Sequence, residues 1–269
     1  MVKRPLRLRK LSVDEIGIAR QNQIVMFSTS PDPYVTIVVN VDAGPLRNLV
    51  NARRESSGRP ITMVHAFNKL LAMCFVEHPE YNCVVLDRKM YELETITISN
   101  PFLLPGDERA LTMLLMDDPQ TKSLEQIFDE MELLKQLKRA EYDELGQMRV
   151  GLVPKLYLRS GLYRVISEKR QFKIVYERNL TTNLVLSKAN NVDTNNFLAT
   201  KGAMQILRTF SRFFLHSIMD QPQVVDGNLT VGQVIPLSMM LDHRLVDGAH
   251  VNAFVRSINR IAAEPEKYL

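Results

Sequence analysis

The chain has 269 residues, of which 45% are hydrophobic and 24% charged, and its formal net charge is +4. These proportions are those of an ordinary globular protein and exclude a disordered, collagen-like or disulfide-stapled chain. No run of about eighteen apolar residues occurs, so we expect no membrane span. The positive charge is mild and scattered, which indicates no nucleic-acid partner.

The two cysteines, Cys74 and Cys83, lie in apolar surroundings without the spacing of a zinc site. We expect two reduced, partly buried thiols in a cytoplasmic protein, because disulfides are rare in that compartment. The basic stretch at residues 3–10 is followed at once by Asp14 and Glu15. Because no apolar segment accompanies it, we expect a solvated amino-terminal arm rather than a targeting signal.

The first half of the chain alternates strand and helix patterns. Runs of β-branched and aromatic residues predict strands at 34–42, 82–87, 90–99 and 108–116, joined in part by turns at 87–89 and 105–107. Apolar residues at helical spacing predict helices at 43–55, from Pro60 to about His78, and at 121–142.

The second half is less regular. Residues 152–178 are basic and aromatic, and their pattern assigns no element. Further elements are predicted as strands at 182–187 and 233–241 and a helix at 248–263. An Asp226-Gly227 pair predicts a hairpin turn before the second of these strands. Since helices and strands interleave without strict βαβ order, we expect a single α/β domain with a mixed sheet.

A dense polar cluster follows the apolar strand at 233–241, where Asp242, His243 and Arg244 stand in a row. Burying ionisable groups at the inner end of a strand is costly, so we expect them to have charged or hydrogen-bonding partners or a functional role. Asp247 precedes Gly248 and the last helix, as an N-cap residue does. The common GxGxxG, P-loop, HExxH and GxSxG motifs are absent, which disfavours dinucleotide hydride transfer, P-loop phosphoryl transfer and nucleophile-elbow hydrolysis.

The run from Asp242 to Gly248 reads DHRLVDG. It resembles the DHRxxDG signature of the catalytic domain of dihydrolipoamide acyltransferases, which are components of 2-oxoacid dehydrogenase complexes and share their fold with chloramphenicol acetyltransferase. Other parts of the chain look like family segments: residues 34–47, 64–83 and 181–187, and the tail with Pro265 and Leu269. The resemblance implies a chloramphenicol acetyltransferase-like α/β fold, a mixed sheet with flanking helices, assembled as a homotrimer with active sites at subunit interfaces. In the family, larger cages are built from such trimers.

The resemblance also implies catalytic roles for three residues. His243 would be the general base that takes the proton of a thiol as its sulfur attacks a thioester carbonyl. A thiol has a pKa of about 8.5 and an imidazole one of about 6.5, so the proton transfer is feasible near neutrality. Ser187 would donate a hydrogen bond to the oxyanion. Asp247 would hold the loop through an ion pair, for which an unidentified arginine of the amino-terminal arm is the candidate.

Two segments depart from the family pattern. Lys188-Ala189-Asn190-Asn191 follows Ser187 where the family has SNxG. The resemblance therefore does not determine the path of the backbone beside the oxyanion site. Residues 108–113 replace the family's GLVVPVI segment near the acyl-donor channel. Residues 199–215 fit a helix, but the family has a strand there, and we favour a strand at about 203–209.

We expect residues 1–269 to form one catalytic domain, with an arm at 1–20 and a family-atypical insertion at 147–180. The insertion is expected to be a lid or an added contact surface. No lipoyl domain and no peripheral-subunit-binding domain are expected, so a lipoyl group would act only in trans.

Three hypotheses about function remain. The first is transfer of an acyl group between coenzyme A, as substrate, and a dihydrolipoyl thiol on a separate protein, with other complex components as partners. The second replaces that acceptor with an alcohol or amine. The third is a non-catalytic scaffold subunit, against which the intact DHRLVDG argues. His65 and His250 are expected to be non-catalytic, on helices away from any carboxylate cluster, and no residues are predicted to bind a metal.

Overall fold

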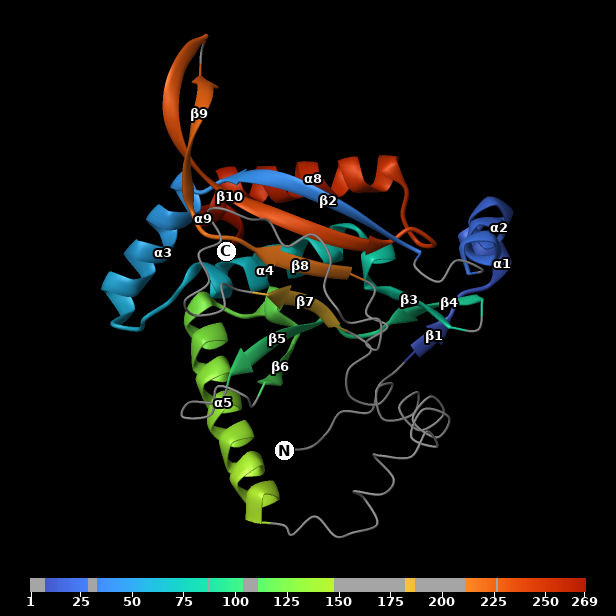
Figure 1. Ribbon diagram of the computed structural model, residues 1–269, viewed down its shortest axis with the longest axis horizontal. Coiled ribbons are helices and arrows are strands. Elements are labelled where there is room, and N and C mark those ends of the chain that lie inside the picture. The colour runs from blue at the N-terminus through green and yellow to red at the C-terminus, as the bar shows by residue number, and fades with distance from the viewer. Residues whose placement is uncertain are drawn as a thin grey trace.

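The computed structural model describes residues 8–28, 33–86, 88–103, 111–147, 182–186, 211–225 and 227–269, and Figure 1 shows their arrangement. The helices have these bounds: α1 (Val13–Ile16), α2 (Ile18–Phe27), α3 (Gly44–Ser57), α4 (Met63–Glu77), α5 (Leu124–Gln147), α8 (Gly248–Ala263) and α9 (Pro265–Tyr268), with short 3-10 turns at η1 (Pro79–Asn82) and η2 (Pro119–Thr121).

The strands form a large mixed sheet and a small antiparallel one (Figure 1). Their bounds are as follows: β1 (Leu8–Lys10), β2 (Tyr34–Asp42), β3 (Cys83–Leu86), β4 (Lys89–Leu93), β5 (Thr97–Leu103), β6 (Leu111–Asp117), β7 (Thr182–Leu186), β8 (Ser211–Leu215), β9 (Met219–Val225) and β10 (Asn228–Asp242). The large sheet has the order β2-β10-β8-β7-β5-β6, with β9 paired to β10, and the small sheet has the order β1-β4-β3.

Strand direction in the large sheet is mixed, as predicted. β7 runs parallel to both β5 and β8, whereas β10 is antiparallel to β2, β8 and β9. The parallel pairs require long crossovers that antiparallel hairpins do not, which explains why helices separate β5 from β7 in the chain. The prediction of a single mixed sheet missed the second sheet.

The core joins β10 to α3, α4 and α8 through apolar side chains. Ile235, Leu237, Met239 and Leu241 alternate along β10 and lie in the same buried cluster as the inner faces of these helices. Phe254 of α8 stands at its centre, where it stacks on Tyr81 with ring centroids 4.0 Å apart and packs on Phe75 and Phe213. This packing fixes both ends of the connection from β10 to α8.

Most helices and strands predicted for the first half are confirmed. The strand at 34–42 and the helices at 43–55, 60–78 and 121–142 correspond to β2, α3, α4 and α5. The strand predicted at 90–99 is wrong, because Glu94-Thr95-Ile96 separate β4 from β5 and carry the chain from the small sheet to the large one. The turn at 105–107, the strand at 203–209 and the segment 152–178 lie outside the described residues.

The described part of the amino-terminal arm, residues 8–20, forms β1, α1 and the start of α2, and the basic residues Arg9 and Lys10 in it are exposed. Ser12 caps α1 through a reciprocal capping box with Glu15. Arg9 bonds to both Glu15 and Glu92, which ties β1 to β4. Ile24 of α2 is fully buried, and its burial in the core anchors the helix.

Both cysteines are free, as predicted, and they are buried more fully than the sequence led us to expect. In the part of the chain that is described, no helix is both long and apolar enough to cross a bilayer.

Candidate active site

The inner half of β10 is buried on both faces, and its last residue, Asp242, is charged. Asp242 is only 2% exposed and is paired with Arg244, whose Nε lies 2.8 Å from Oδ1 and whose Nη2 lies 2.5 Å from Oδ2. The backbone N–H of Arg244 also donates to Oδ1, at 3.0 Å. The pair therefore neutralises the buried carboxylate and closes the turn that follows, as the sequence predicted for charges at this place.

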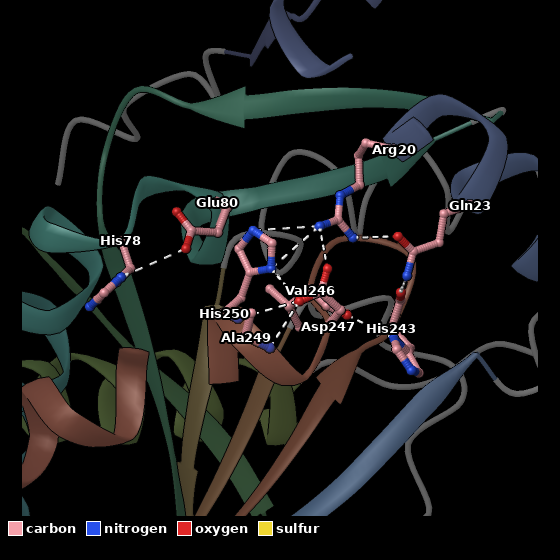
Figure 2. A network of polar contacts seen from close by, with 9 residues as sticks. All are labelled: Arg20, Gln23, His78, Glu80, His243, Val246, Asp247, Ala249 and His250. Carbon is pink, nitrogen blue, oxygen red and sulfur yellow. Dashed lines mark hydrogen bonds and ion pairs between the residues drawn. The ribbon is translucent and has the colours of Figure 1, made fainter. Parts of the chain in front are cut away.

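This turn presents the imidazole of His243 with one nitrogen already engaged. Nδ1 lies 2.8 Å from the backbone carbonyl of Val246. A carbonyl only accepts, so Nδ1 carries the hydrogen, and in the neutral ring Nε2 is left with its lone pair. Among the described residues no hydrogen bond reaches Nε2, and Figure 2 shows that end of the ring without a dashed line. The partly buried ring stacks on Phe27 of α2, with centroids 5.1 Å apart.

Asp247 is the N-cap of α8, and its carboxylate also contacts the side chains of Arg20 and His250. Its Oδ1 accepts from the backbone N–H groups of Ala249 and His250, at 3.0 and 3.4 Å, and lies 2.8 Å from Nδ1 of His250. Its Oδ2 accepts from Arg20 at 3.1 Å. The bond from the His250 side chain, above all, lowers the pKa of Asp247 to about 2. Asp247 is therefore anionic at neutral pH.

Helix α2 supplies the side chains that hold this loop. Arg20 and Gln23 are three positions apart and share a helix face. Arg20 Nη1 donates to Gln23 Oε1 at 2.6 Å, and Gln23 Nε2 donates to the backbone carbonyl of His243 at 2.9 Å. Figure 2 shows Arg20 between Gln23, Asp247 and His250. Arg20 is thus the arginine of the arm whose pairing with Asp247 was expected.

One contact of the site was not predicted, and one predicted residue is left untested. His250, which was expected to lie away from any carboxylate cluster, bonds to the single carboxylate of Asp247 from the third position of α8. That spacing from the N-cap is the one at which a side chain reaches back to the cap, so the sequence did carry the signal. Ser187 lies outside the described residues, immediately after β7 ends at Leu186.

Gln23 and Phe27 were missed because they stand more than two hundred positions before His243 in the sequence. No local pattern marks a residue for a contact so distant. Within the described ranges, no group of three His, Cys, Asp or Glu side chains is placed to hold a metal ion.

Comparison with known proteins identifies related chains for the segment that contains this site. Residues 213–269 match the family model described as 2-oxoacid dehydrogenases acyltransferase (catalytic domain). Over 51 residues the chain is 35% identical to the lipoamide acyltransferase component of the branched-chain alpha-keto acid dehydrogenase complex of Pseudomonas aeruginosa. Over 55 residues it is 33% identical to a dihydrolipoyllysine-residue succinyltransferase component of Arabidopsis thaliana. The first match covers 19% of this chain, the second 20%, and each covers 12% of the relative.

Solved structures match nearly the whole chain in fold. A probable dihydrolipoamide acetyltransferase of Listeria monocytogenes has a TM-score of 0.63 at 19% identity, over 95% of this chain and 94% of its own. The dihydrolipoamide acetyltransferase of Azotobacter vinelandii has a TM-score of 0.64 at 18% identity, over 92% and 88%. A chloramphenicol acetyltransferase has a TM-score of 0.58 at 13% identity, over 95% and 100%. The resemblance drawn from DHRLVDG is therefore confirmed, and the chain has the chloramphenicol acetyltransferase-like fold of dihydrolipoamide acyltransferase catalytic domains.

Proposed function

We propose that the protein is an acyltransferase that moves an acyl group between coenzyme A and a dihydrolipoyl thiol carried in trans by a separate protein. The observation that carries this proposal is the imidazole of His243, which has Nδ1 held by the Val246 carbonyl and Nε2 left as a proton acceptor. The names of the matched relatives support the same chemistry.

In the proposed reaction, Nε2 of His243 takes the proton of the attacking thiol while its sulfur bonds to the thioester carbonyl carbon. The tetrahedral intermediate then collapses, the bond to the original sulfur breaks, and the leaving thiolate recovers the proton from Nε2. Coenzyme A and the lipoyl group are substrates here, and no covalent enzyme intermediate forms. Ser187 is proposed as the oxyanion donor.

The reacting thiol belongs to the substrates and not to the protein. Burial raises the pKa of the Cys83 thiol to about 12, and it also raises that of Cys74. Both groups are therefore protonated and shielded near neutral pH. The same free thiols favour a reducing, cytoplasmic location.

Asp247 is proposed to keep the base in place rather than to touch the substrate. The A. vinelandii structure was determined to investigate a serine, a histidine and an asparagine in the catalytic mechanism of that enzyme, and its histidine and asparagine are four positions apart. His243 and Asp247 have the same spacing. In this chain Asp247 would act through the cap of α8 and the Arg20 ion pair.

The test replaces His243 with Gln, which keeps the size of the side chain but cannot take a proton near neutral pH. Transfer from acetyl-CoA to dihydrolipoamide should fall by about a hundredfold or more, the usual contribution of a general base. The matched control is His78→Gln, because His78 contacts Ser257 at the junction of α4 and α8 and has no part in the proposed chemistry. Equal turnover of H243Q and the parent would refute the proposal.

A panel of acceptors separates the first hypothesis from the other two. Dihydrolipoamide, an aryl alcohol and an alkyl amine are each offered with acetyl-CoA, and only the thiol should be acylated. Acylation of the alcohol or amine alone would contradict the acceptor. Failure of coenzyme A to bind in calorimetry would contradict the enzyme itself and favour a scaffold.

We propose further that the chain assembles as a homotrimer; the proposed chemistry does not require a larger cage. The β9–β10 hairpin extends beyond the body of the protein (Figure 1). Val224, Leu229 and Val231 of this hairpin are each more than 70% exposed: 73%, 76% and 76%. Apolar surface gathered on a projecting element is typical of an interface, and a second copy of the chain is the proposed occupant. Native mass spectrometry should show a trimer, and a monomer alone would contradict this assembly.

A further inference from the structure

We infer that Gln23 is a positioning residue for His243, an inference that rests on the proposed role of His243 as the base. Gln23 lies on α2, 220 positions before His243, and donates from Nε2 to its backbone carbonyl at 2.9 Å. Its partner Arg20 donates to Gln23 Oε1 at 2.6 Å. Since Arg20 has only donors, it fixes which end of the amide faces His243.

The Gln23 bond completes the restraint of the His243 backbone. The N–H of His243 donates to the carbonyl of Pro33 at 2.8 Å, and its carbonyl accepts from Gln23. Both backbone polar groups of His243 are thus held by segments from the other end of the chain. Because the direction of the Cα–Cβ bond follows from the backbone, these two hydrogen bonds fix the direction in which the His243 side chain leaves the backbone.

The side chain of His243 is restrained only after its backbone is placed. The bond from Nδ1 to the Val246 carbonyl is 2.8 Å, close to the usual optimum, and a hydrogen bond weakens steeply when its geometry shifts. Release of the His243 carbonyl would lengthen this bond and mix the two tautomers. Only the tautomer with hydrogen on Nδ1 leaves Nε2 as an acceptor.

Arg20 gives the arrangement a second anchor. One nitrogen of its guanidinium holds Gln23 at the start of the turn, and another holds Asp247 at its end. The two contacts therefore span the loop from His243 to Asp247, and the fully buried Ile24 keeps α2 in place beneath it.

The test is Gln23→Glu, which preserves the shape and the Arg20 contact but sets a carboxylate oxygen against the His243 carbonyl. We expect kcat to fall by about tenfold or more with the KM for acetyl-CoA unchanged, because a misplaced catalytic group slows the chemical step. The control is Gln21→Glu: it makes the same change on the same helix and loses an equivalent amide-to-carbonyl bond, to Arg88 at 3.2 Å, outside the site.

A readout independent of activity is the tautomer of His243, measured from its ¹⁵N shifts. The parent and Gln21→Glu should hold hydrogen on Nδ1, and Gln23→Glu should populate both tautomers. If Gln23→Glu lowers the melting temperature, Gln23→Met, which has no hydrogen-bonding amide, is measured in its place. Unchanged kcat with an unchanged tautomer would overturn the inference. Should the parent itself lack acyl transfer, the proposed function fails, while the tautomer comparison still tests Gln23.

Discussion

The carboxylate of Asp242 lies at the buried end of β10, and its neutralisation depends on one neighbour. Its side chain is 3% exposed and that of Arg244 is 18% exposed. A buried ion pair is costly to break because one charge is left without a partner in a medium of low polarity. Asp242 and Arg244 thus build the turn and hold His243, which lies between them in the sequence, at its rim.

Asp242→Ala should accordingly lower the free energy of unfolding by about 3–5 kcal/mol, the usual cost of removing one partner from a buried pair. The control is Asp129→Ala, since Asp129 forms a similar bidentate ion pair with Arg59 at the surface. Exposed pairs contribute little, so D129A should have a much smaller effect. Urea denaturation measures both, and equal losses would contradict the assignment.

Asp247 should make stability depend on pH in the acid range. Its pKa is lowered from 3.8 to about 2 in the folded chain, so its stabilising effect is full above pH 3.8 and is lost as the pH falls through about 2. Asp247→Asn keeps an N-cap but removes the charge. The difference in unfolding free energy between parent and D247N should shrink as the pH falls from about 4 toward 2. A difference that does not change with pH would be inconsistent with this ionisation.

Helix α2 connects folding to the site, because its only fully buried side chain, among those described, is Ile24. Ile24→Ala should lower stability by about 2–5 kcal/mol, speed amide hydrogen exchange across α2 and reduce acyl transfer by loosening Arg20 and Gln23. Ile18→Ala is the control, since Ile18 is on the same helix but 71% exposed. Exchange in α2 that is equally slow in both variants would show that Ile24 is not the anchor.

Elements with a clear internal pattern could be predicted from the sequence, and those defined by distant partners could not. The apolar run that ends at Leu241 was enough to place Asp242 inside the fold. β9 was missed because Asp220, Pro222 and two glutamines give it little strand character. Proline is tolerated there because β9 pairs on only one side in the described sheet. The break between β4 and β5 was missed because propensity does not say to which sheet a residue belongs.

The same limit applies to the site. DHRLVDG pointed to His243 and Asp247 because these seven consecutive residues resemble a family signature. Arg20, Gln23 and Phe27 come to it only through the packing of α2, and nothing in their own sequence neighbourhood distinguishes them from other helix residues. Residues that act through tertiary contacts therefore need the structure.

At the level of the whole molecule, the hairpin provides the sharpest test of assembly. Leu229→Glu combined with Val231→Glu places charge on side chains that are each 76% exposed, so the monomer should fold unchanged while association is lost. Val13→Glu is the control, since Val13 is 45% exposed on α1. Native mass should shift from trimer to monomer for the double variant only. A trimer that persists would show that the hairpin is not the contact.

β10 is a single uninterrupted strand from Asn228, next to the hairpin tip, to Asp242, a span of roughly 50 Å at the usual rise per residue. Its exposed half carries Leu229 and Val231 and its buried half ends next to His243. If the hairpin is the contact between copies, that contact and the proposed base are therefore joined by one continuous strand.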